Sequence, residues 1–409
     1  MTTSFATETS NQDGRIPVSV LTGFLGAGKT TLLNHLTRHR DMAGVVVLIN
    51  EFGEVGIDHH LVERVDESIL LLDSGCLCCS MQGDFVNALK TLHERLARRE
   101  IAEIRRVVVE TTGLADPVPV LYTLMEQRYV SARYVCDGVL TVVDGSRSPE
   151  NLAKQAEAVR QVVMADRILV SKADISSRET LEKVETWVRD LNPTAPVFRT
   201  SQGDIAPRHL FSGGVYSPSE RPDEVTSWLH DLSVQEQGHH GHHHALDHHH
   251  HGDSAATAIR SFTLCFDQPV SWRGLAVTMG DILQQHGAEL LRVKGVLAVL
   301  GSDAPMVVQC VEDVAYPAVQ LARWPANGPL ADRKGRLVFI TRGLSPEDEL
   351  SIKERLADLP DDNAAFRVLA ANPTLVTRCW LSQRLPWMGN GSFETSGWVV
   401  QPPIRARRA

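Results

Sequence analysis

The sequence GFLGAGKT, at Gly23–Thr30, constrains the fold of this chain more than any other feature. It follows the apolar run VSVLT and opens the helical stretch TLLNHL, so it connects a strand to a helix. In that context glycines let backbone N–H groups turn toward phosphates, a lysine reaches the β- and γ-phosphates, and a hydroxyl binds Mg²⁺. The N-terminus of the helix adds a partial positive charge. The sequence therefore predicts a site for a nucleoside triphosphate with Mg²⁺, formed by Gly23, Gly26, Gly28, Lys29, Thr30 and Thr31.

The first half of the chain has the pattern of an open α/β sheet. Short runs of Val, Ile and Leu alternate with amphipathic stretches, as expected for parallel strands that are buried on both faces. Ligands of such a sheet gather at the carboxyl ends of its strands. The expected strands are Val18–Thr22, Val45–Asn50, Ser68–Leu72, Arg106–Glu110, Gly138–Asp144, Arg167–Ser171 and Val197–Thr200, and the helical patterns include Thr31–Arg40, Asp84–Arg99 and Pro149–Val163.

The second half contains a linker and a smaller α+β domain. Nine histidines lie within His239–His251, and a stretch of this composition cannot build a core, which predicts a solvated linker. Beyond it we expect strands at Ile259–Phe266, Gly295–Leu300, Met306–Cys310 and Leu337–Thr341, and helices at Trp272–His286 and Pro346–Leu356. The expected division is a disordered N-terminus at 1–15, a P-loop NTPase domain with a mostly parallel sheet at 16–215, the His-rich linker at 216–258, the α+β domain at 259–358 and a tail without an assigned fold at 359–409.

Composition excludes several classes of protein. The formal net charge of −9 argues against a nucleic-acid partner, because such binding depends on basic surface. The polar N-terminus has no apolar core of a secretory signal, and no run of eighteen apolar residues predicts a membrane span. We therefore expect a cytoplasmic protein, in which thiols stay reduced and clustered cysteines bind metal or act in redox chemistry.

Two further strand ends carry polar groups suited to a nucleotide. Glu110 ends an expected strand, where a carboxylate can hold Mg²⁺, and Gly113 follows with an N–H that can sense the γ-phosphate. The sequence SKAD, at Ser171–Asp174, ends another strand. Its carboxylate can accept both N1–H and the exocyclic amine of guanine, whereas adenine has no such donor pair, and Lys172 would lie along the base. Guanine is therefore favoured, although each segment could also be an ordinary surface turn.

The sequence GCLCC places Cys76, Cys78 and Cys79 within four residues. Three thiolates this close suit Zn²⁺, Co²⁺ or Cu⁺, and three ligands leave one coordination position open. A thiol redox switch and inert buried cysteines are the alternatives. For the isolated Cys136, Cys265, Cys310 and Cys379, burial in the core is the expectation.

The loop NEFGEVGID, at Asn50–Asp58, follows the second expected strand. Its carboxylates could reach the Mg²⁺ shell or the cysteine-bound metal, and Glu51 is the predicted ligand; a plain charged loop is the alternative. Histidines at the density of His239–His251 bind divalent metals with loose geometry, which suggests a collector of metal rather than the working site. His35, His39, His59 and His60 are expected to be ordinary surface or packing residues.

Taken together, these motifs resemble the CobW-like family of metallochaperone GTPases. The phosphate loop, NEFGEVGID, GCLCC, ETTGLADP and SKAD match it in order and spacing over residues 16–205, and RVKGVLAV and GRLVFITRGL resemble its C-terminal domain. The resemblance implies GTP hydrolysis coupled to delivery of a transition metal, and it implies that Cys76, Cys78 and Cys79 are the metal ligands. Ser171 stands where guanine-binding motifs often have Asn, so specificity would depend on Asp174.

The resulting hypothesis is a GTP-gated carrier of zinc first and cobalt second, with a client metalloprotein as partner and a homodimer as one possible assembly. Lys29 and Glu110 are its predicted catalytic residues, and Thr30, Glu51 and Glu110 its predicted Mg²⁺ or metal ligands besides the cysteines. No residue stands out as a catalytic base, so intrinsic turnover would be slow and a client would accelerate it. The alternatives are a P-loop kinase for a small metabolite, with Glu110 or Asp116 positioning a hydroxyl, and a passive His-rich metal buffer.

Overall fold

The computed structural model describes residues 14–49, 69–71, 81–211, 259–326, 329–376 and 380. The chain divides into two compact units, one that contains the described residues 14–211 and one that contains nearly all of the described residues from 259 onward. Glu51, Cys76, Cys78, Cys79, Cys379 and the His-rich segment, for which the sequence makes predictions, lie outside the described residues. None of the described helices is long and apolar enough to cross a membrane.

The first unit contains a seven-stranded sheet in the order β3-β2-β4-β1-β5-β6-β7, and every pairing in it is parallel. The predicted α/β class is confirmed. Strands β2 and β4 are buried at every position because helices cover both faces of the sheet. The strands are β1 (Ile16–Thr22), β2 (Val45–Ile49), β3 (Ile69–Leu71), β4 (Arg106–Glu110), β5 (Tyr134–Asp144), β6 (Arg167–Ser171) and β7 (Val197–Arg199).

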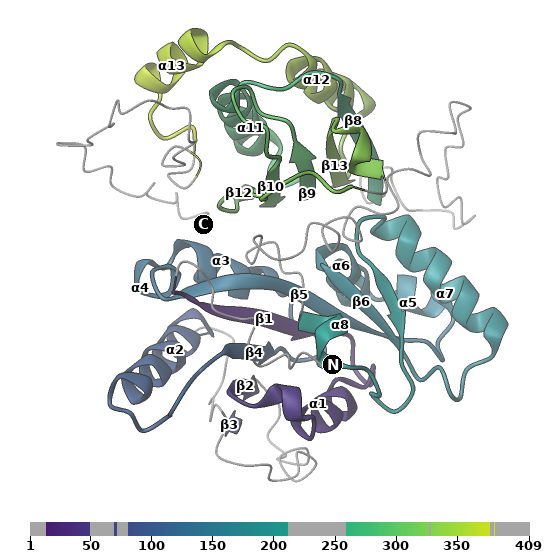
Figure 1. The fold of residues 1–409 in the computed structure, drawn as a ribbon. Coiled ribbons are helices and arrows are strands. Elements are labelled where there is room, and N and C mark those ends of the chain that lie inside the picture. The colour runs from purple at the N-terminus through teal and green to yellow at the C-terminus, as the bar shows by residue number, and fades with distance from the viewer. Residues whose placement is uncertain are drawn as a thin grey trace, which may run out of the picture. The chain divides into compact units, whose positions relative to one another are not determined.

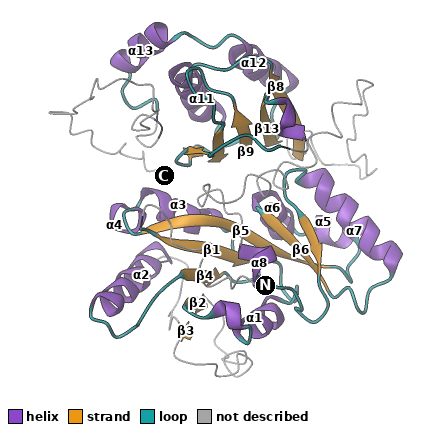
Figure 2. Cartoon of the chain, in the orientation of Figure 1, coloured by secondary structure: helices purple, strands orange, loops and turns teal. Residues whose placement is uncertain are grey.

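Eight helices are described in this unit, and they form layers on the two sides of the sheet (Figures 1 and 2). Leu32, Leu33 and Leu36 of the first helix pack with Leu140 and Val142 in one core. On the opposite face, the hydroxyl of Thr141 donates to the carbonyl of Gln161 at 2.8 Å. The helices are α1 (Lys29–Thr37), α2 (Met81–Ala97), α3 (Val118–Glu126), α4 (Arg128–Ser131), α5 (Pro149–Ala153), α6 (Ala156–Met164), α7 (Arg178–Leu191) and α8 (Pro207–Phe211).

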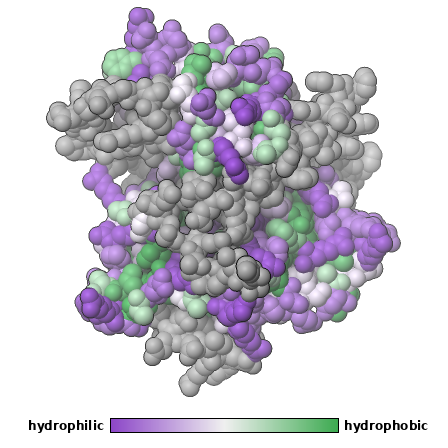
Figure 3. Space-filling view, viewed as in Figure 1, coloured by the Kyte–Doolittle hydropathy of each residue, from purple (hydrophilic) through white to green (hydrophobic). Residues whose placement is uncertain are grey.

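Helix α7 illustrates how patterning sets these layers. Ser177 caps its first turn by accepting the N–H of Thr180, and its apolar stripe of Leu181, Val184 and Val188 is buried. The opposite side is charged and hydrophilic, as the space-filling view shows at the edge of the molecule (Figure 3). An apolar stripe at helical spacing thus fixes which side faces the sheet.

The second unit has an antiparallel sheet in the order β11-β10-β9-β13-β8, with β12 paired to β10. One face of this sheet packs on the helices around Trp272, Leu275, Val293 and Phe339. The predicted smaller α+β unit is confirmed. Its elements are β8 (Ile259–Phe266), α11 (Trp272–His286), β9 (Leu290–Leu297), β10 (Met306–Val311), β11 (Val314–Ala315), β12 (Val319–Gln320), β13 (Gly335–Arg342), α12 (Pro346–Ala357) and α13 (Asp362–Ala371).

The chain beyond residue 358, for which the sequence suggests no fold, contributes to this second core. Ala365 of α13, Val376 and Trp380 belong to it. The indole N–H of Trp272 donates to the carbonyl of Trp380 at 3.0 Å, and the indole N–H of Trp380 donates to the carbonyl of Tyr316 at 2.6 Å. Both buried indoles therefore have a hydrogen-bond acceptor, as large amphipathic rings require.

Three local predictions were wrong. The expected helix Pro149–Val163 is two helices, because Gln155 adopts an extended backbone as the N-cap of α6 while the amphipathic pattern continues across the break. The expected strand Gly295–Leu300 is β9, which begins at Leu290; the buried charges of Arg292 and Lys294 concealed its first half. Cys265 is exposed rather than buried because it points from β8 to the less covered side, whereas Cys136 and Cys310 are buried as expected.

Candidate functional site

The glycines of the phosphate loop have conformations that other residues rarely adopt. Gly23 has a φ of +148°, and a Cβ there would overlap the carbonyl oxygen of Val142 on β5. Gly28 has a φ of +97° and is the N-cap of α1. Left-handed backbone at Gly26 and Gly28 turns the loop tightly before the helix begins. The helix N-terminus, with its unpaired N–H groups, is thereby placed at the carboxyl edge of the sheet.

Lys29 and Glu110 lie together at this edge. The ammonium group of Lys29 donates to the carbonyl oxygen of Gly23 at 2.8 Å. Burial lowers the pKa of Lys29, and the charge of Glu110 acts in the opposite direction. Glu110 ends β4 with an exposed fraction of 7%, opposite Leu21 of β1. Pairing of β1 with β4 therefore brings Glu110 close to Lys29. The lysine would contact phosphate oxygens, and the carboxylate would bind Mg²⁺.

The loop after β4 packs against the phosphate loop. A Cβ on Gly113 would lie 2.7 Å from the backbone nitrogen of Leu25, so only glycine allows this approach. The buried side chain of Gln161 on α6 donates to the carbonyl oxygens of Gly113 and Ala115, at 3.3 and 3.1 Å. Helix α6 thus holds the predicted γ-phosphate sensor in place. The sequence analysis missed Gln161 because its partners lie 46 and 48 residues away.

Asp116 lies in the same loop, and both of its carboxylate oxygens are engaged. One accepts the N–H of Val118 at 3.0 Å and the other accepts Nε of Arg160 at 2.6 Å. A carboxylate bonded in this way anchors the start of α3. Asp116, one of the two residues either of which could serve the kinase alternative, therefore has a positional role in this structure.

The base side of the site is a cavity of about 220 Å³ between the phosphate loop and the end of β6. Asp174 is exposed at its rim, and its Oδ2 accepts the side-chain amide of Gln202 at 2.8 Å. Lys172 has a φ of +58°, and its ammonium group pairs with Asp144 at the end of β5. The residues that line this cavity include Gly28, Thr31, Ser171, Lys172, Asp174, Ile175, Thr200, Gln202 and Gly203.

Ser171 bridges this side of the site to the phosphate loop. Its hydroxyl donates to the carbonyl oxygen of Ala27 at 2.6 Å and lies 3.2 Å from that of Val143. Ser171 therefore forms a hydrogen bond to the phosphate loop although it replaces the Asn that is common at this position. Because the hydroxyl is directed at these carbonyls, Asp174 remains the side chain suited to reading the base.

Asp144 is a site residue that the sequence analysis did not single out. It ends β5 beside Ser171 of β6, and it is buried. Burial alone would raise the pKa of this carboxyl, but hydrogen bonds from Lys172 and Ser146 outweigh burial, so the pKa lies below its ordinary value. The sequence could have indicated Asp144, because it is an acidic residue at the end of a strand, as Glu110 is.

The described residues bracket the cysteine motif without including it. Strand β3 ends at Leu71 and α2 begins at Met81, so the connection that contains GCLCC starts at the carboxyl edge of the parallel sheet. The connection after β2 (Val45–Ile49), which contains Glu51, starts at the same edge. Within the described ranges, no three His, Cys, Asp or Glu side chains are grouped to hold a metal ion.

Comparisons with known proteins agree with this arrangement. Residues 17–199 match the model of the CobW/HypB/UreG nucleotide-binding domain, and residues 259–359 match the cobalamin synthesis protein cobW C-terminal domain. The zinc chaperone YjiA of Escherichia coli is 31% identical over 82% of this chain and 96% of its own length. A zinc-regulated GTPase metalloprotein activator 1 of Schizosaccharomyces pombe is 32% identical over 46% of this chain and 47% of its own length.

A solved structure extends the comparison to the fold. The crystal structure of Zn(II)-bound YjiA GTPase from Escherichia coli has a TM-score of 0.56 and 28% identity, and the alignment covers 85% of this chain and 99% of that one. The two matched domains, in this order, and the full-length relative confirm the resemblance predicted from the motifs. The chain belongs to the CobW family, with a CobW/HypB/UreG nucleotide-binding domain followed by a CobW C-terminal domain.

Proposed function

We propose that this chain is a GTP-hydrolysing metallochaperone that carries zinc, with cobalt as the second choice, to a client metalloprotein in the cytoplasm. One observation carries the proposal: the connections that contain Glu51 and GCLCC start at the same edge of the sheet as the phosphate loop. The relatives support it, because they are described as zinc chaperones and as a zinc-regulated GTPase metalloprotein activator.

The nucleotide site would work through groups already in place. Lys29 would exchange its bond to the Gly23 carbonyl for the β- and γ-phosphate oxygens. Thr30 and Glu110 supply a hydroxyl and a carboxylate, the oxygen ligands that Mg²⁺ prefers, and a bound Mg²⁺ would neutralise phosphate charge. Gly113, held by Gln161 and packed on Leu25, would sense the γ-phosphate. Asp174 would accept hydrogen bonds from guanine.

Coupling between the two sites would follow from their shared edge. When the γ-phosphate is present, the loop that carries Gly113 and the connection that carries Glu51 would be ordered together. Ordering them beside Cys76, Cys78 and Cys79 would assemble the metal site, and hydrolysis would loosen it. A client would then receive the metal and accelerate the slow intrinsic turnover. A homodimer is one assembly in which this could take place.

The coupling is tested by titrating Zn²⁺ into the protein bound to a non-hydrolysable GTP analogue and then to GDP. We expect tighter zinc binding with the analogue, because a nucleotide shifts metal binding only through differential interaction. Equal zinc affinity in the two states would contradict the proposal. Cys78→Ser should abolish tight zinc binding, whereas Cys265→Ser, at an exposed cysteine outside the motif, serves as the matched control.

A deletion separates a chaperone from a passive buffer. Removal of His239–His251 should lower the number of zinc ions bound while the tight thiol site keeps its affinity. Loss of most zinc affinity on that deletion would favour the buffer instead. The readout is the same titration, with a competing chromophoric chelator to resolve the tight site from weak ones.

A further inference from the structure

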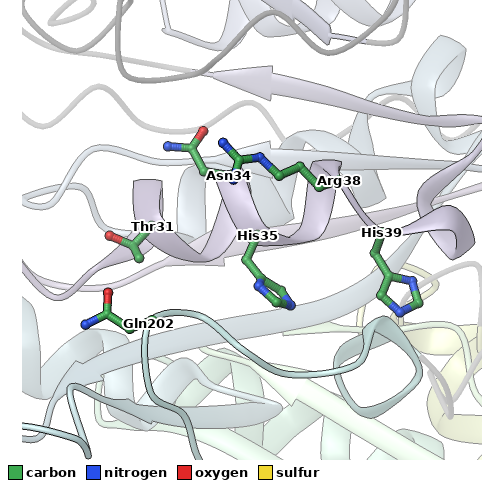
Figure 4. Close-up of a pocket in the computed structure, with 6 residues that line it drawn as sticks. All are labelled: Thr31, Asn34, His35, Arg38, His39 and Gln202. Carbon is green, nitrogen blue, oxygen red and sulfur yellow. The ribbon is translucent and has the colours of Figure 1, made fainter.

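A second cavity, of about 350 Å³, lies along α1 (Lys29–Thr37) and beyond its end. All of the side chains that line it are polar and none is acidic (Figure 4). Two of them, Thr31 and Gln202, also line the base cavity, so the two cavities adjoin. Its lining residues are Thr31, Asn34, His35, Arg38, His39 and Gln202.

The two histidines of this cavity suggest a metal site at first sight, since they are four residues apart. The hydrogen bonds argue against it. Nδ1 of His39 accepts the backbone N–H of Asp41 at 3.2 Å, so in the neutral ring Nε2 carries the proton and has no lone pair for a metal. Nε2 of His35 faces a carboxylate oxygen of Asp204 at 3.5 Å. As noted above, the described residues contain no metal-binding group of three such side chains.

The lining instead offers hydrogen-bond donors. Arg38 supplies a guanidinium, which binds phosphate through a planar fork of N–H groups. Asn34 supplies an amide, Thr31 a hydroxyl, and His39 an Nε2–H. Figure 4 shows Asn34 and Arg38 extending to one side of α1 and the two imidazoles to the other, so these groups line different parts of the cavity. An oxygen-rich anion is the ligand class that this chemistry fits.

The position of the cavity indicates where such an anion would come from. The phosphate loop would hold the 5′-phosphates at Gly23–Thr30, and the base would lie by Lys172 and Asp174. The ribose joins these two parts, so it would lie by Thr31 and Gln202, the residues shared by both cavities. Substituents on the ribose hydroxyls would therefore extend into the cavity along α1.

We propose that the cavity along α1 binds a phosphate group carried on the ribose of a guanine nucleotide. The ligand class is a guanine nucleotide phosphorylated both at the 5′ position and at the 2′ or 3′ hydroxyl. Such a nucleotide would compete with GTP for the same site while gaining a contact with Arg38. This inference rests on the proposed guanine specificity of the site.

The test compares the dissociation constants of GDP, ADP, guanosine 5′-diphosphate 3′-diphosphate and 2′-phosphorylated GDP for the full-length protein by calorimetry. We expect at least one of the two ribose-phosphorylated nucleotides to bind about tenfold more tightly than GDP, because it adds charge-assisted hydrogen bonds. Arg38→Gln should bring that ratio close to one. Arg40→Gln should keep the wild-type ratio, since Arg40 is a neighbouring arginine that is 86% exposed and does not line the cavity.

The outcomes separate this inference from the function on which it rests. If GDP binds more tightly than ADP but neither ribose phosphate improves on GDP, the cavity proposal is overturned and guanine specificity stands. If GDP binds no better than ADP, guanine specificity fails and the cavity proposal fails with it. A ratio that survives Arg38→Gln would also overturn the assignment, because the added phosphate would then be bound elsewhere.

Discussion

Nζ of Lys172 lies 2.7 Å from Oδ2 of Asp144, and this ion pair joins the ends of two neighbouring strands. The same carboxylate oxygen lies 3.3 Å from Nε of Arg147. Nη2 of Arg147 donates to the carbonyl oxygen of Leu25 in the phosphate loop at 3.4 Å. A single buried carboxylate therefore connects the base side of the nucleotide site to its phosphate side.

Asp144→Asn should weaken GDP binding. The substitution removes the negative charge that orients both Lys172 and Arg147, and hydrogen bonds between charged groups contribute about 1.5–3 kcal/mol. We expect the dissociation constant for GDP to rise about tenfold or more, measured by calorimetry. Glu179→Gln is the control, because that carboxylate forms an exposed ion pair with Lys183 on α7. Unchanged GDP affinity in Asp144→Asn would show that this connection has no part in binding.

Gly113→Ala should slow GTP hydrolysis and reduce the preference for GTP over GDP. The added methyl group would lie 2.7 Å from the backbone nitrogen of Leu25, so one of the two loops must move. Displacement of a positioning group by about 1 Å can lower a rate by about a hundredfold, and we expect a loss of at least about tenfold in kcat. Phosphate release under single-turnover conditions measures it.

The matched control for Gly113→Ala is Gly83→Ala. Gly83 is exposed in α2, and a Cβ there would meet no atom within 4 Å. Alanine favours a helix over glycine, so this control should leave hydrolysis unchanged and keep the fold intact. Equal rates for the two variants would mean that the close approach of Gly113 to Leu25 is unimportant for turnover.

Protonation of Glu185 should make the first unit less stable in acid. The hydrogen bond from Arg199 lowers the pKa of Glu185, although burial acts in the opposite direction. Because the folded-state pKa lies below the ordinary value of 4.5, this stabilisation is present above that value and is lost as the pH falls through the lowered pKa. The free energy of unfolding, measured in urea between about pH 6 and pH 3, should fall more steeply for wild type than for Glu185→Gln. Parallel curves would contradict this.

Trp380→Ala should destabilise the second unit. Its ring is 2% exposed and lies 5.1 Å from that of Trp272, and removal of a buried aromatic side chain lowers stability by about 3–5 kcal/mol. Hydrogen exchange should therefore become faster in α11 and β9, while the first unit keeps its protection. Phe366→Ala, at a 46% exposed position on α13, should have little effect. Unaltered exchange in Trp380→Ala would exclude this residue from the core.

The sequence by itself determined the features that depend on local pattern. The phosphate loop was predictable because its glycines, lysine and threonine lie within eight residues, between a strand and a helix. Helix α11 was predicted with both of its ends correct, since its apolar stripe and its Ser271 cap are both local signals. The family followed from short motifs in a fixed order, and the matches to both domains confirmed it.

Only the tertiary structure decided which distant side chains complete the nucleotide site. Strand order places β5 beside β1 and β6 beside β5, and this brings Asp144 and Ser171 to the phosphate loop although they are far from it in sequence. The contact of Gln161 with Gly113 depends on the packing of α6 over the sheet. Likewise, Arg292 and Lys294 carry charges that do not suggest a buried strand. They are recognised as residues of β9 only from its pairing with β10 and β13. Hydrophobic periodicity predicts which face of a helix or strand is buried, whereas contacts between segments depend on which strands are neighbours in the sheet.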